Sequence, residues 1–495
     1  MKNNIMTKKC TICYILAVFV IYWKRYHIWY RKRFLIMLCK KRIEGSTVLK
    51  KKNLKLFSPA GNSAGATSTV DPDTISPETG KPWSKALVWR FLIAFIIYGI
   101  LNNAAFTLNG AVLLPQHIKD VGIGNPTAAY GVITSVTSLV SLFVGYIWGT
   151  LSDRTRSRFG KRTPWIFIGS FVAGIGLYSL GIFESTTSLT MAYIFNTLGQ
   201  NAIQTPMYAF LADRAPKNVR GTLSAGFGAT SVGAPVGQFI SSYFLGQSYQ
   251  SMGFVVGGIM IAASGLIVLA MTPREKSSKE AVVPKNESVL DVMSTLLPPS
   301  LKGGHDFYKA CVGRFLIMTS YTMIFQYLIY ILEDHLGLSV LAAARAMNTL
   351  SLFTLVVSMI GLFISGPLSD RLRARKIPVA FGGLLMIAGA ISMLLFKSVN
   401  GVIGYVVLAG LGYGIYLAVD MALNIDVIPD EAKEKKTTGK YVGFGNLTNT
   451  AGQMLAPAAT SIIVTATGSY NLVFTGSIMV TLVGIAFILW IKHVK

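Results

Sequence analysis

Long apolar segments separated by short polar connections make up most of the chain from residue 88 onward. An α-helix needs about 20 mostly apolar residues to cross the hydrocarbon core of a bilayer. Segments of about this length lie at residues 88–112, 127–150, 164–183, 189–211, 221–245, 252–272, 308–332, 339–367, 378–396, 401–425, 440–466 and 470–491. This pattern predicts an all-α polytopic membrane protein with twelve transmembrane helices.

The composition agrees with this prediction. Hydrophobic residues make up 52% of the 495 positions and charged residues only 14%, which is too apolar for a soluble protein. No segment outside the predicted spans is long enough for a soluble enzyme domain, so we expect no enzyme activity. The pair Cys10 and Cys13 has no second ligand pair, so we also expect no metal site and no cofactor.

The basic residues are distributed as membrane topology requires. The net charge is +25, and residues 1–56 hold 15 of the 46 basic residues and one of the 21 acidic ones. Elsewhere Lys and Arg gather in the connections after spans two, four, eight and ten and in the central connection. The positive-inside rule then predicts a multi-pass protein of the cell membrane with both termini in the cytoplasm. Because topology explains the charge, we expect no nucleic-acid partner.

The predicted spans divide the chain into four parts. These are an N-terminal extension with a polar tail (1–85), a first six-helix bundle (86–272), a central cytoplasmic linker (273–306) and a second six-helix bundle (307–495). Residues 1–57 contain no proline and differ in composition from the rest. Three interpretations of them remain open: upstream sequence added by a mis-assigned start, a basic segment on the membrane surface, and an additional anchor.

The most specific local signal is a dense basic connection after the second span. Gly149–Trp165 reads GTLSDRTRSRFGKRTPW, and its first part recurs in Gly366–Pro378, which reads GPLSDRLRARKIP. Asp153 and Asp370 occupy the same place in the two copies, 217 residues apart, and the tetrapeptide RFLI occurs both at 90 and at 314. The chain therefore consists of two homologous halves, and the spans should form two pseudo-symmetric six-helix bundles.

These motifs and the six-plus-six layout resemble the major facilitator superfamily, in which a glycine, an Asp-Arg pair and further basic residues follow the second helix of each half. The longer form between Asp153 and Trp165 is most similar to the glycoside-pentoside-hexuronide cation symporters and the sucrose transporters. The resemblance covers roughly Ser84 to the C-terminus. It implies a carrier whose two bundles rock around a central site.

The resemblance also implies a cytoplasmic latch at the repeated loops. A carboxylate at a helix end can pair with loop arginines and a neighbouring helix terminus, and so hold the cytoplasmic side closed in one state. The latch candidates are Gly149, Asp153, Arg154, Gly160, Arg162, Asp213, Arg220, Gly366, Asp370 and Arg371. The alternative is that the arginines only fix the topology.

Polar side chains recur at helical spacing inside several spans. Asn196, Gln200 and Gln204 are four residues apart, so they share one face of the fourth span. Amides and tyrosines suit a neutral ligand with many hydroxyl groups. The substrate-binding candidates are Asn102, Asn103, Asn196, Gln200, Gln204, Gln326, Tyr327, Tyr416, Asn424, Asn446 and Asn449. The alternative is that these residues only hold helices together.

Asp420 is the one acidic residue that we place near the middle of a span, and we assign no Lys or Arg to such a depth. Because apolar surroundings disfavour an ionised carboxylate, Asp420 is the proton-coupling candidate; the alternative is a structural carboxylate paired with a neighbouring helix. The resemblance associates sodium coupling with acidic residues in spans two and four, and these spans have none before the terminal Asp153 and Asp213. A proton is therefore favoured over sodium.

We therefore expect a secondary active transporter that works by alternating access and takes up a sugar or glycoside with a proton. Its partners would be this small-molecule substrate, the proton and the lipid bilayer. The first alternative is proton-driven efflux of drugs or metabolites, since the same architecture serves both directions. The second alternative is a non-transporting membrane sensor, for which only the N-terminal extension could supply a signalling segment.

Overall fold

The computed structural model describes residues 80–216, 232–247, 249–279, 305–372, 376–429 and 438–491, together with positions 75, 76, 78, 219 and 223. The expectations for residues 1–57, for most of the central linker and for Arg220 lie outside the described residues. All described residues belong to the unit Val70–Lys495.

The first half of the chain is a series of long helices. α2 (Lys85–Thr107) continues through a π-helical turn, η2 (Leu108–Leu113), into α3 (Leu114–Asp120). The helices that follow are α4 (Pro126–Arg154), α5 (Thr163–Leu180), α6 (Thr186–Arg214), α8 (Gly233–Gly246) and α9 (Gln250–Met271). α3 lies beyond the first predicted span, which ended at residue 112, whereas each of the other helices falls within a predicted span or extends it by a few residues.

The second half repeats this order. α11 (His305–Phe325) is followed by α12 (Leu328–Tyr330) and by a second π-helical turn, η4 (Ile331–His335). The helices that follow are α13 (Val340–Leu372), α14 (Lys376–Leu395), α15 (Val399–Asp426), α17 (Thr438–Thr467) and α18 (Asn471–Leu489). A π-helical turn therefore lies near the end of the first long span of each half.

The all-α class is confirmed, whereas the count of twelve spans is supported only in part. Among the described residues, eight helices are long and apolar enough to cross a membrane, or nine if α11 and the bent α12–η4 segment form one span. The long helices α6 and α17 are not among them, because their polar stripes lower the mean apolarity. For α8 only 14 helical residues are described.

Local sequence determines where several helices begin. The side-chain oxygen of Asn125 accepts a hydrogen bond from the Ala128 amide at 3.0 Å, and Pro126 occupies the first helical position of α4. Ser185 and Ser188 form a capping box at the start of α6. These side chains satisfy amide groups that have no partner inside the helix.

Close helix contacts recur at equivalent positions of the two halves. A Cβ atom on Gly169 of α5 would lie 2.9 Å from the Gly199 carbonyl oxygen of α6. The equivalent pairing occurs 213 residues later, where a Cβ on Gly382 of α14 would lie 2.6 Å from the Gly412 oxygen of α15. Small residues allow membrane helices to approach this closely. The sequence repeat is thus also a repeat of helix packing.

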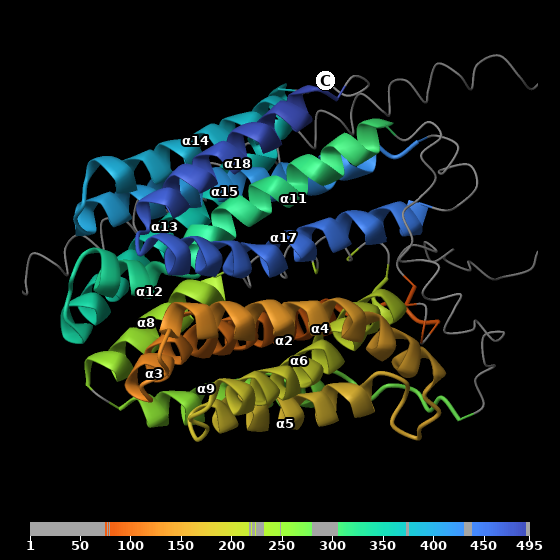
Figure 1. Cartoon of the computed structure of the whole chain (residues 1–495). Helices are drawn as coiled ribbons and strands as arrows, with labels where there is room; N and C mark the ends of the chain where they lie inside the picture. The colour runs from red at the N-terminus through yellow and green to blue at the C-terminus, as the bar shows by residue number, and fades with distance from the viewer. Residues whose placement is uncertain are drawn as a thin grey trace, which may run out of the picture. The chain divides into compact units, whose positions relative to one another are not determined.

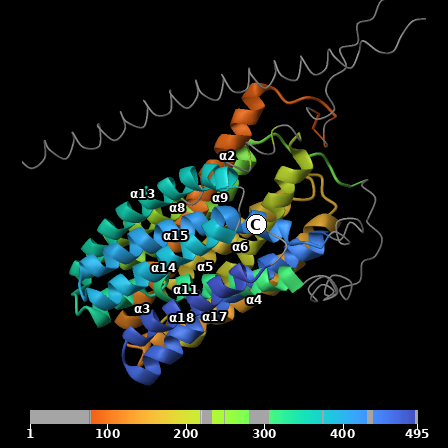
Figure 2. The ribbon, with the colours of Figure 1, turned by 90° about the horizontal axis from the view of Figure 1, so that it is seen from above.

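The helix neighbours follow the same symmetry. α5 packs on α6 and α9 as α14 packs on α15 and α18, and α2 packs on α8 and α9 as α11 packs on α17 and α18. The halves meet where α4 packs on α17 and where α8 packs on α13. Figures 1 and 2 both show α17 beside α4 and α11, so this helix belongs to the second half and also lines its interface with the first.

Candidate functional site

The basic loop after α4 forms a charge cluster with the ends of α4, α5 and α6. We call Asp153, Arg162, Asp213 and Glu275 the basic-end cluster. Arg162 is buried, and its Nη2 lies 2.5 Å from Asp153 Oδ1 and 3.1 Å from Asp213 Oδ2. Its Nη1 donates to the Ser152 hydroxyl at 2.9 Å. One arginine therefore links the ends of α4 and α6, which both belong to the first half; its action as a latch stays a prediction.

Glu275 completes this cluster from the segment that follows α9. Its carboxylate accepts hydrogen bonds from the backbone amides of Lys161, Arg162 and Thr163 at 3.0 to 3.3 Å, and from the Thr163 hydroxyl at 3.1 Å. Gly160 precedes these donors with a φ of +95°, a conformation that glycine adopts without strain. Glu275 was not predicted as a site residue, although an acidic residue just after a span and opposite a basic loop is a usable signal.

The other latch candidates are placed less completely. Gly149 lies where α4 packs on α6, and a Cβ there would make an ordinary contact of 3.5 Å with the Thr205 methyl group, so the packing does not require glycine. Arg154 is the last residue of α4. Gly366, Asp370 and Arg371 lie in the helical backbone of α13, but their side chains lie outside the described residues, as does Arg220. A matching cluster in the second half therefore stays a prediction.

The amide stripe of the first half divides into two kinds of residue. Asn102 Nδ2 of α2 donates to Gln200 Oε1 of α6 at 3.1 Å, and both side chains are half-buried. Gln204, one turn further along α6, is exposed. Asn196 is buried and donates to the Ala173 carbonyl of α5 at 2.9 Å, which is the contact of a residue that holds helices together.

The remaining amide candidates also differ in their surroundings. Asn103 donates to the Gly99 carbonyl within its own helix at 2.9 Å. Gln326 and Asn449 are half-buried, and Asn446 is exposed. Asn446 and Asn449 therefore leave polar groups of α17 accessible, whereas Asn196 is buried and the Oε1 atom of Gln326, just after α11, is buried without a described hydrogen-bond partner.

The proton-coupling candidate has a cationic partner that the sequence did not predict. Arg314 Nε of α11 lies 2.9 Å from Asp420 Oδ2 of α15, and both residues are buried. Asn424 Nδ2, one turn after Asp420, donates to Asp420 Oδ1 at 3.2 Å. Tyr416, one turn before it, is buried on the same face of the helix. These side chains form a buried polar group between α11 and α15.

The expectation that no Lys or Arg lies at such depth was therefore wrong. The span was predicted to begin at residue 308, but α11 begins at His305, so Arg314 lies about 14 Å into the helix. Asp420 in turn lies about 9 Å from the end of α15 rather than at its middle. The repeat of RFLI marked Arg314 as part of a span, and this was the signal available in the sequence.

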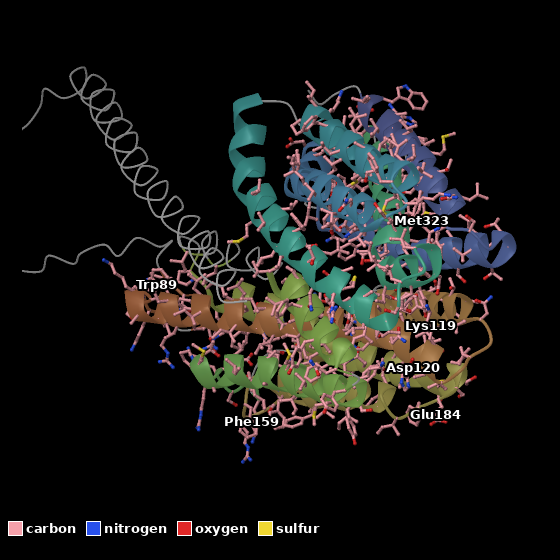
Figure 3. All side chains as sticks on the ribbon, turned by 90° about the vertical axis from the view of Figure 1, so that its left-hand side faces the viewer. Trp89, Lys119, Asp120, Phe159, Glu184 and Met323 are labelled. Atoms are coloured by element: carbon pink, nitrogen blue, oxygen red, sulfur yellow. The ribbon has the colours of Figure 1, made fainter. Side chains whose placement is uncertain are left out.

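The opposite ends of the helices carry a second polar group, which joins the two halves. We call Lys119, Tyr130, Tyr327, Tyr330, Glu333 and Asp334 the far-end contact. Lys119 Nζ lies 2.8 Å from Glu333 Oε2 and 2.5 Å from Asp334 Oδ1. Figure 3 shows Lys119 and Trp89 at opposite ends of the first span. This ion pair connects α3 of the first half with η4 of the second.

Tyrosines pack directly beneath this ion pair. The Tyr330 hydroxyl donates to the Pro115 carbonyl of α3 at 3.0 Å, and its ring lies 5.9 Å from that of Tyr130 on α4. Tyr327, predicted as a substrate residue, is buried here, with its ring 5.3 Å from Tyr130 and its hydroxyl 3.0 Å from the Pro457 carbonyl. The two halves thus touch closely at the end remote from the basic loop.

Comparison with known proteins agrees with this two-half architecture. The profile of the Major Facilitator Superfamily matches residues 48–231, 91–433 and 310–495, so both halves are recognised separately and together. The chain belongs to the Major Facilitator Superfamily. As a member of this superfamily it is a membrane transporter and not an enzyme.

Relatives of this superfamily member include carriers of sugars and glycosides. It is 21% identical over 373 residues to the "Glucuronide carrier protein homolog" of Escherichia coli K12, covering 70% of this chain and 76% of the relative. It is 28% identical over 218 residues to the "Sucrose transport protein SUC3" of Arabidopsis thaliana, covering 38% of this chain and 34% of the relative. Both are consistent with the glycoside symporter and sucrose transporter branch.

Solved transporter structures share the fold of this superfamily member. A bacterial homolog of the human lysosomal transporter Spinster, in an inward-facing and occupied conformation, matches with a TM-score of 0.62 at 15% identity, over 83% of this chain and 98% of that one. The nucleoside transporter NupG matches with a TM-score of 0.63 at 12% identity, over 81% of this chain and 100% of that one. At these identities the likeness concerns the fold alone.

Proposed function

We propose that this transporter takes up a sugar or glycoside together with a proton by alternating access. The observation that carries the coupling is Asp420, a carboxylate of α15 that is 1% exposed and whose cationic partner among the described residues is Arg314. A buried ionisable residue in a span is costly, and such residues often belong to proton or ion pathways. A carboxylate that loses its charge on protonation can change its pairing as the carrier changes state.

Half-buried amides support a ligand rich in hydroxyl groups. Asn102, Gln200, Gln326 and Asn449 come from both halves and can each donate and accept hydrogen bonds. The names of the relatives, a glucuronide carrier and a sucrose transport protein, point to the same kind of substrate. Amide side chains are less typical of a cavity for amphipathic drugs, which is usually lined by aromatic residues and methionine.

The charged loops and the far-end contact indicate which end of the transporter faces the cytoplasm and which end is closed. The positive-inside rule assigns one basic loop to the cytoplasm, namely the loop with Arg154, Arg156, Arg158, Lys161 and Arg162. With this orientation the protein lies in the cell membrane and both of its termini face the cytoplasm. The far-end contact would then lie outside and close the path from that side. Alternating access requires this contact to break when the outward-open state forms.

The test is the external pH of lightly buffered, energy-depleted cells that express the full chain, recorded as single sugars and glycosides are added. Symport predicts alkalinisation by one class of sugar, and none in cells that carry the empty vector. No response to any sugar, combined with resistance of the cells to toxic compounds, would instead favour proton-driven efflux.

A further inference from the structure

The loop between α4 and α5 carries three cations that have no carboxylate partner. Arg162, at the end of this loop, pairs with two carboxylates of the basic-end cluster. Among the described residues, in contrast, no ion pair includes Arg156, Arg158 or Lys161. The positive charge of these three side chains is therefore not neutralised by the part of the protein that the structure describes.

The carboxylates nearest to this loop already have other partners. Asp153 and Asp213 both pair with Arg162. Glu275 accepts hydrogen bonds from three backbone amides and one hydroxyl at the start of α5. The cations that remain therefore present an uncompensated positive surface at the cytoplasmic end of the first half.

Arg156 is half-buried and only weakly held. Its Nη1 donates to the carbonyl oxygens of Asp153 at 3.4 Å and Thr155 at 3.3 Å, and both hydrogen bonds are longer than usual. Its Nε and Nη2 atoms are buried and have no hydrogen-bond acceptor among the described residues. Because buried donors without an acceptor are unfavourable, the side chain gains by turning outward to meet an anion.

An exposed aromatic ring lies beside these cations. Arg158 is exposed, and its guanidinium carbon lies 4.7 Å from the centre of the Phe159 ring. Phe159 itself is 54% exposed, and Figure 3 shows it at the periphery of the first half. Basic residues next to an exposed apolar ring are typical of protein surfaces that enter the boundary between lipid headgroups and acyl chains.

The length of α5 places this loop at the depth of the headgroups. α5 has 18 residues and begins at Thr163, directly after the loop. Its length is about 27 Å, slightly less than the roughly 30 Å of the hydrocarbon core. One face of α5 is apolar and between 43% and 57% exposed at Phe167, Ile168, Phe171 and Ile175, so this face contacts lipid. The residues just before Thr163 therefore lie beside lipid headgroups.

We propose that Arg156, Arg158 and Lys161 bind the headgroup of an anionic phospholipid in the cytoplasmic leaflet. The two guanidinium groups donate to the phosphate oxygens, which they fit through parallel hydrogen bonds, and the ammonium group of Lys161 adds a third positive charge. Phe159 lies against the upper part of the acyl chains. The negative surface of the cytoplasmic leaflet attracts such basic residues. The site does not depend on which substrate is transported.

The test measures lipid binding to the purified full chain in detergent by native mass spectrometry. Phosphatidylglycerol is compared with phosphatidylcholine of the same acyl chains, because both contain a phosphate but only the first has a net negative charge. We expect the tightest phosphatidylglycerol to bind at least about tenfold more strongly than phosphatidylcholine. Equal affinity for the two lipids would contradict the proposal.

Matched variants assign the preference to this loop. Each cation near an anionic headgroup contributes roughly fivefold, so Arg158→Gln should weaken the tightest phosphatidylglycerol about fivefold, and Arg156→Gln with Arg158→Gln about 25-fold. Neither residue has a carboxylate partner, so both variants should elute from size-exclusion chromatography as wild type does. Arg274→Gln removes one exposed arginine outside the site and is the control, with unchanged binding expected. Equal weakening by Arg158→Gln and Arg274→Gln would show attraction by overall charge and overturn the site.

A second measurement separates a lipid from a free anion. Thermal unfolding of the wild type in detergent is followed with added phosphatidylglycerol and, separately, with inorganic phosphate at the same concentration. We expect phosphatidylglycerol to raise the Tm of the wild type but not that of the double variant, and inorganic phosphate to raise neither. If inorganic phosphate stabilises the wild type as much as the lipid does, the loop binds free anions and the lipid site is wrong.

Discussion

The two halves of this transporter share a backbone but differ in the chemistry at equivalent positions. The glycine pairs that join α5 to α6 and α14 to α15 lie 213 residues apart, and the same distance places Met207 at the position of Asp420. Met207 is buried and apolar, whereas Asp420 is buried and paired with Arg314. Arg90, the counterpart of Arg314 in the repeated RFLI, is exposed.

This difference shows how a duplicated fold can place neutral amides in one half and an ionic pair in the other. The first half keeps neutral amides such as Asn102 and Gln200 in contact across α2 and α6. The second half holds the ionic pair between α11 and α15. Helix packing tolerates either chemistry, because the glycine contacts that set the spacing are the same in both halves. The fold is therefore symmetric while the candidate coupling site is not.

Breaking the ionic pair on one side should have the largest effect. Arg314→Ala leaves Asp420 buried without its cation, and breaking a buried ion pair in this way costs about 3–5 kcal/mol. We expect a large loss of folded protein in detergent, measured by size-exclusion chromatography after heating. Met207→Leu, at the matching position of the first half, is the control and should behave nearly as wild type. If the two variants are equally stable, the ion pair between Arg314 and Asp420 does not stabilise the folded protein.

The far-end contact should have the next largest effect, because its ion pair joins the two halves at that end. Lys119→Gln removes the cation shared by Glu333 and Asp334. The pair is partly exposed, so we expect a change of about 1 kcal/mol, or roughly fivefold, toward separation of the far ends. Distances between spin labels on the two halves at this end would report it. Unchanged distance distributions would mean that the ion pair does not hold the halves together.

The cap provided by Glu275 should have an effect of similar size, confined to the first half. Glu275→Ala removes the acceptor at the start of α5, and loss of such a cap costs about 1 kcal/mol. We expect faster proteolysis of the loop before Thr163. Glu184→Ala, at an exposed position labelled in Figure 3, is the matched control and should leave the loop as resistant as in wild type. If both variants are cleaved at the same rate, Glu275 does not stabilise the loop before Thr163.

The amide pair of the first half should affect substrate binding rather than folding. Asn102→Ala removes one half-buried hydrogen bond to Gln200, worth about 1 kcal/mol. We expect a modest rise in KM for the transported sugar and little change in stability. The same substitution at Asn196, which bonds to the backbone of α5, should lower stability rather than raise KM. If Asn102→Ala lowers stability and Asn196→Ala raises KM, Asn102 holds helices together and Asn196 contacts the substrate.

The sequence predicted the fold well because its signals are local and periodic. Apolar segments, the repeated SDR motif and the distribution of charge were enough to place the helices and the two halves. Three members of the basic-end cluster were among the predicted latch residues: Asp153 at the end of α4, Arg162 just before α5 and Asp213 at the end of α6. Glu275 was missed because it joins this loop from 112 or more residues away in the chain.

The candidate coupling site was predictable only in part. Asp420 could be recognised as an acidic residue within an apolar segment, but its partner Arg314 lies on another helix, and pairing between helices leaves no periodic signal. The same holds for Lys119 and Glu333, whose contact depends on how the two halves meet. Equal spacing also could not separate Asn196, which bonds to a neighbouring helix, from Gln204, which is exposed.

Transport by Asp420→Asn in proteoliposomes tests the central claim most directly. Asparagine keeps the size and the hydrogen bonding of the side chain but cannot exchange a proton. We predict that this variant loses accumulation of the sugar against its gradient when a pH gradient is imposed, and retains counterflow exchange. Accumulation equal to that of wild type would show that Asp420 does not couple the proton to the substrate.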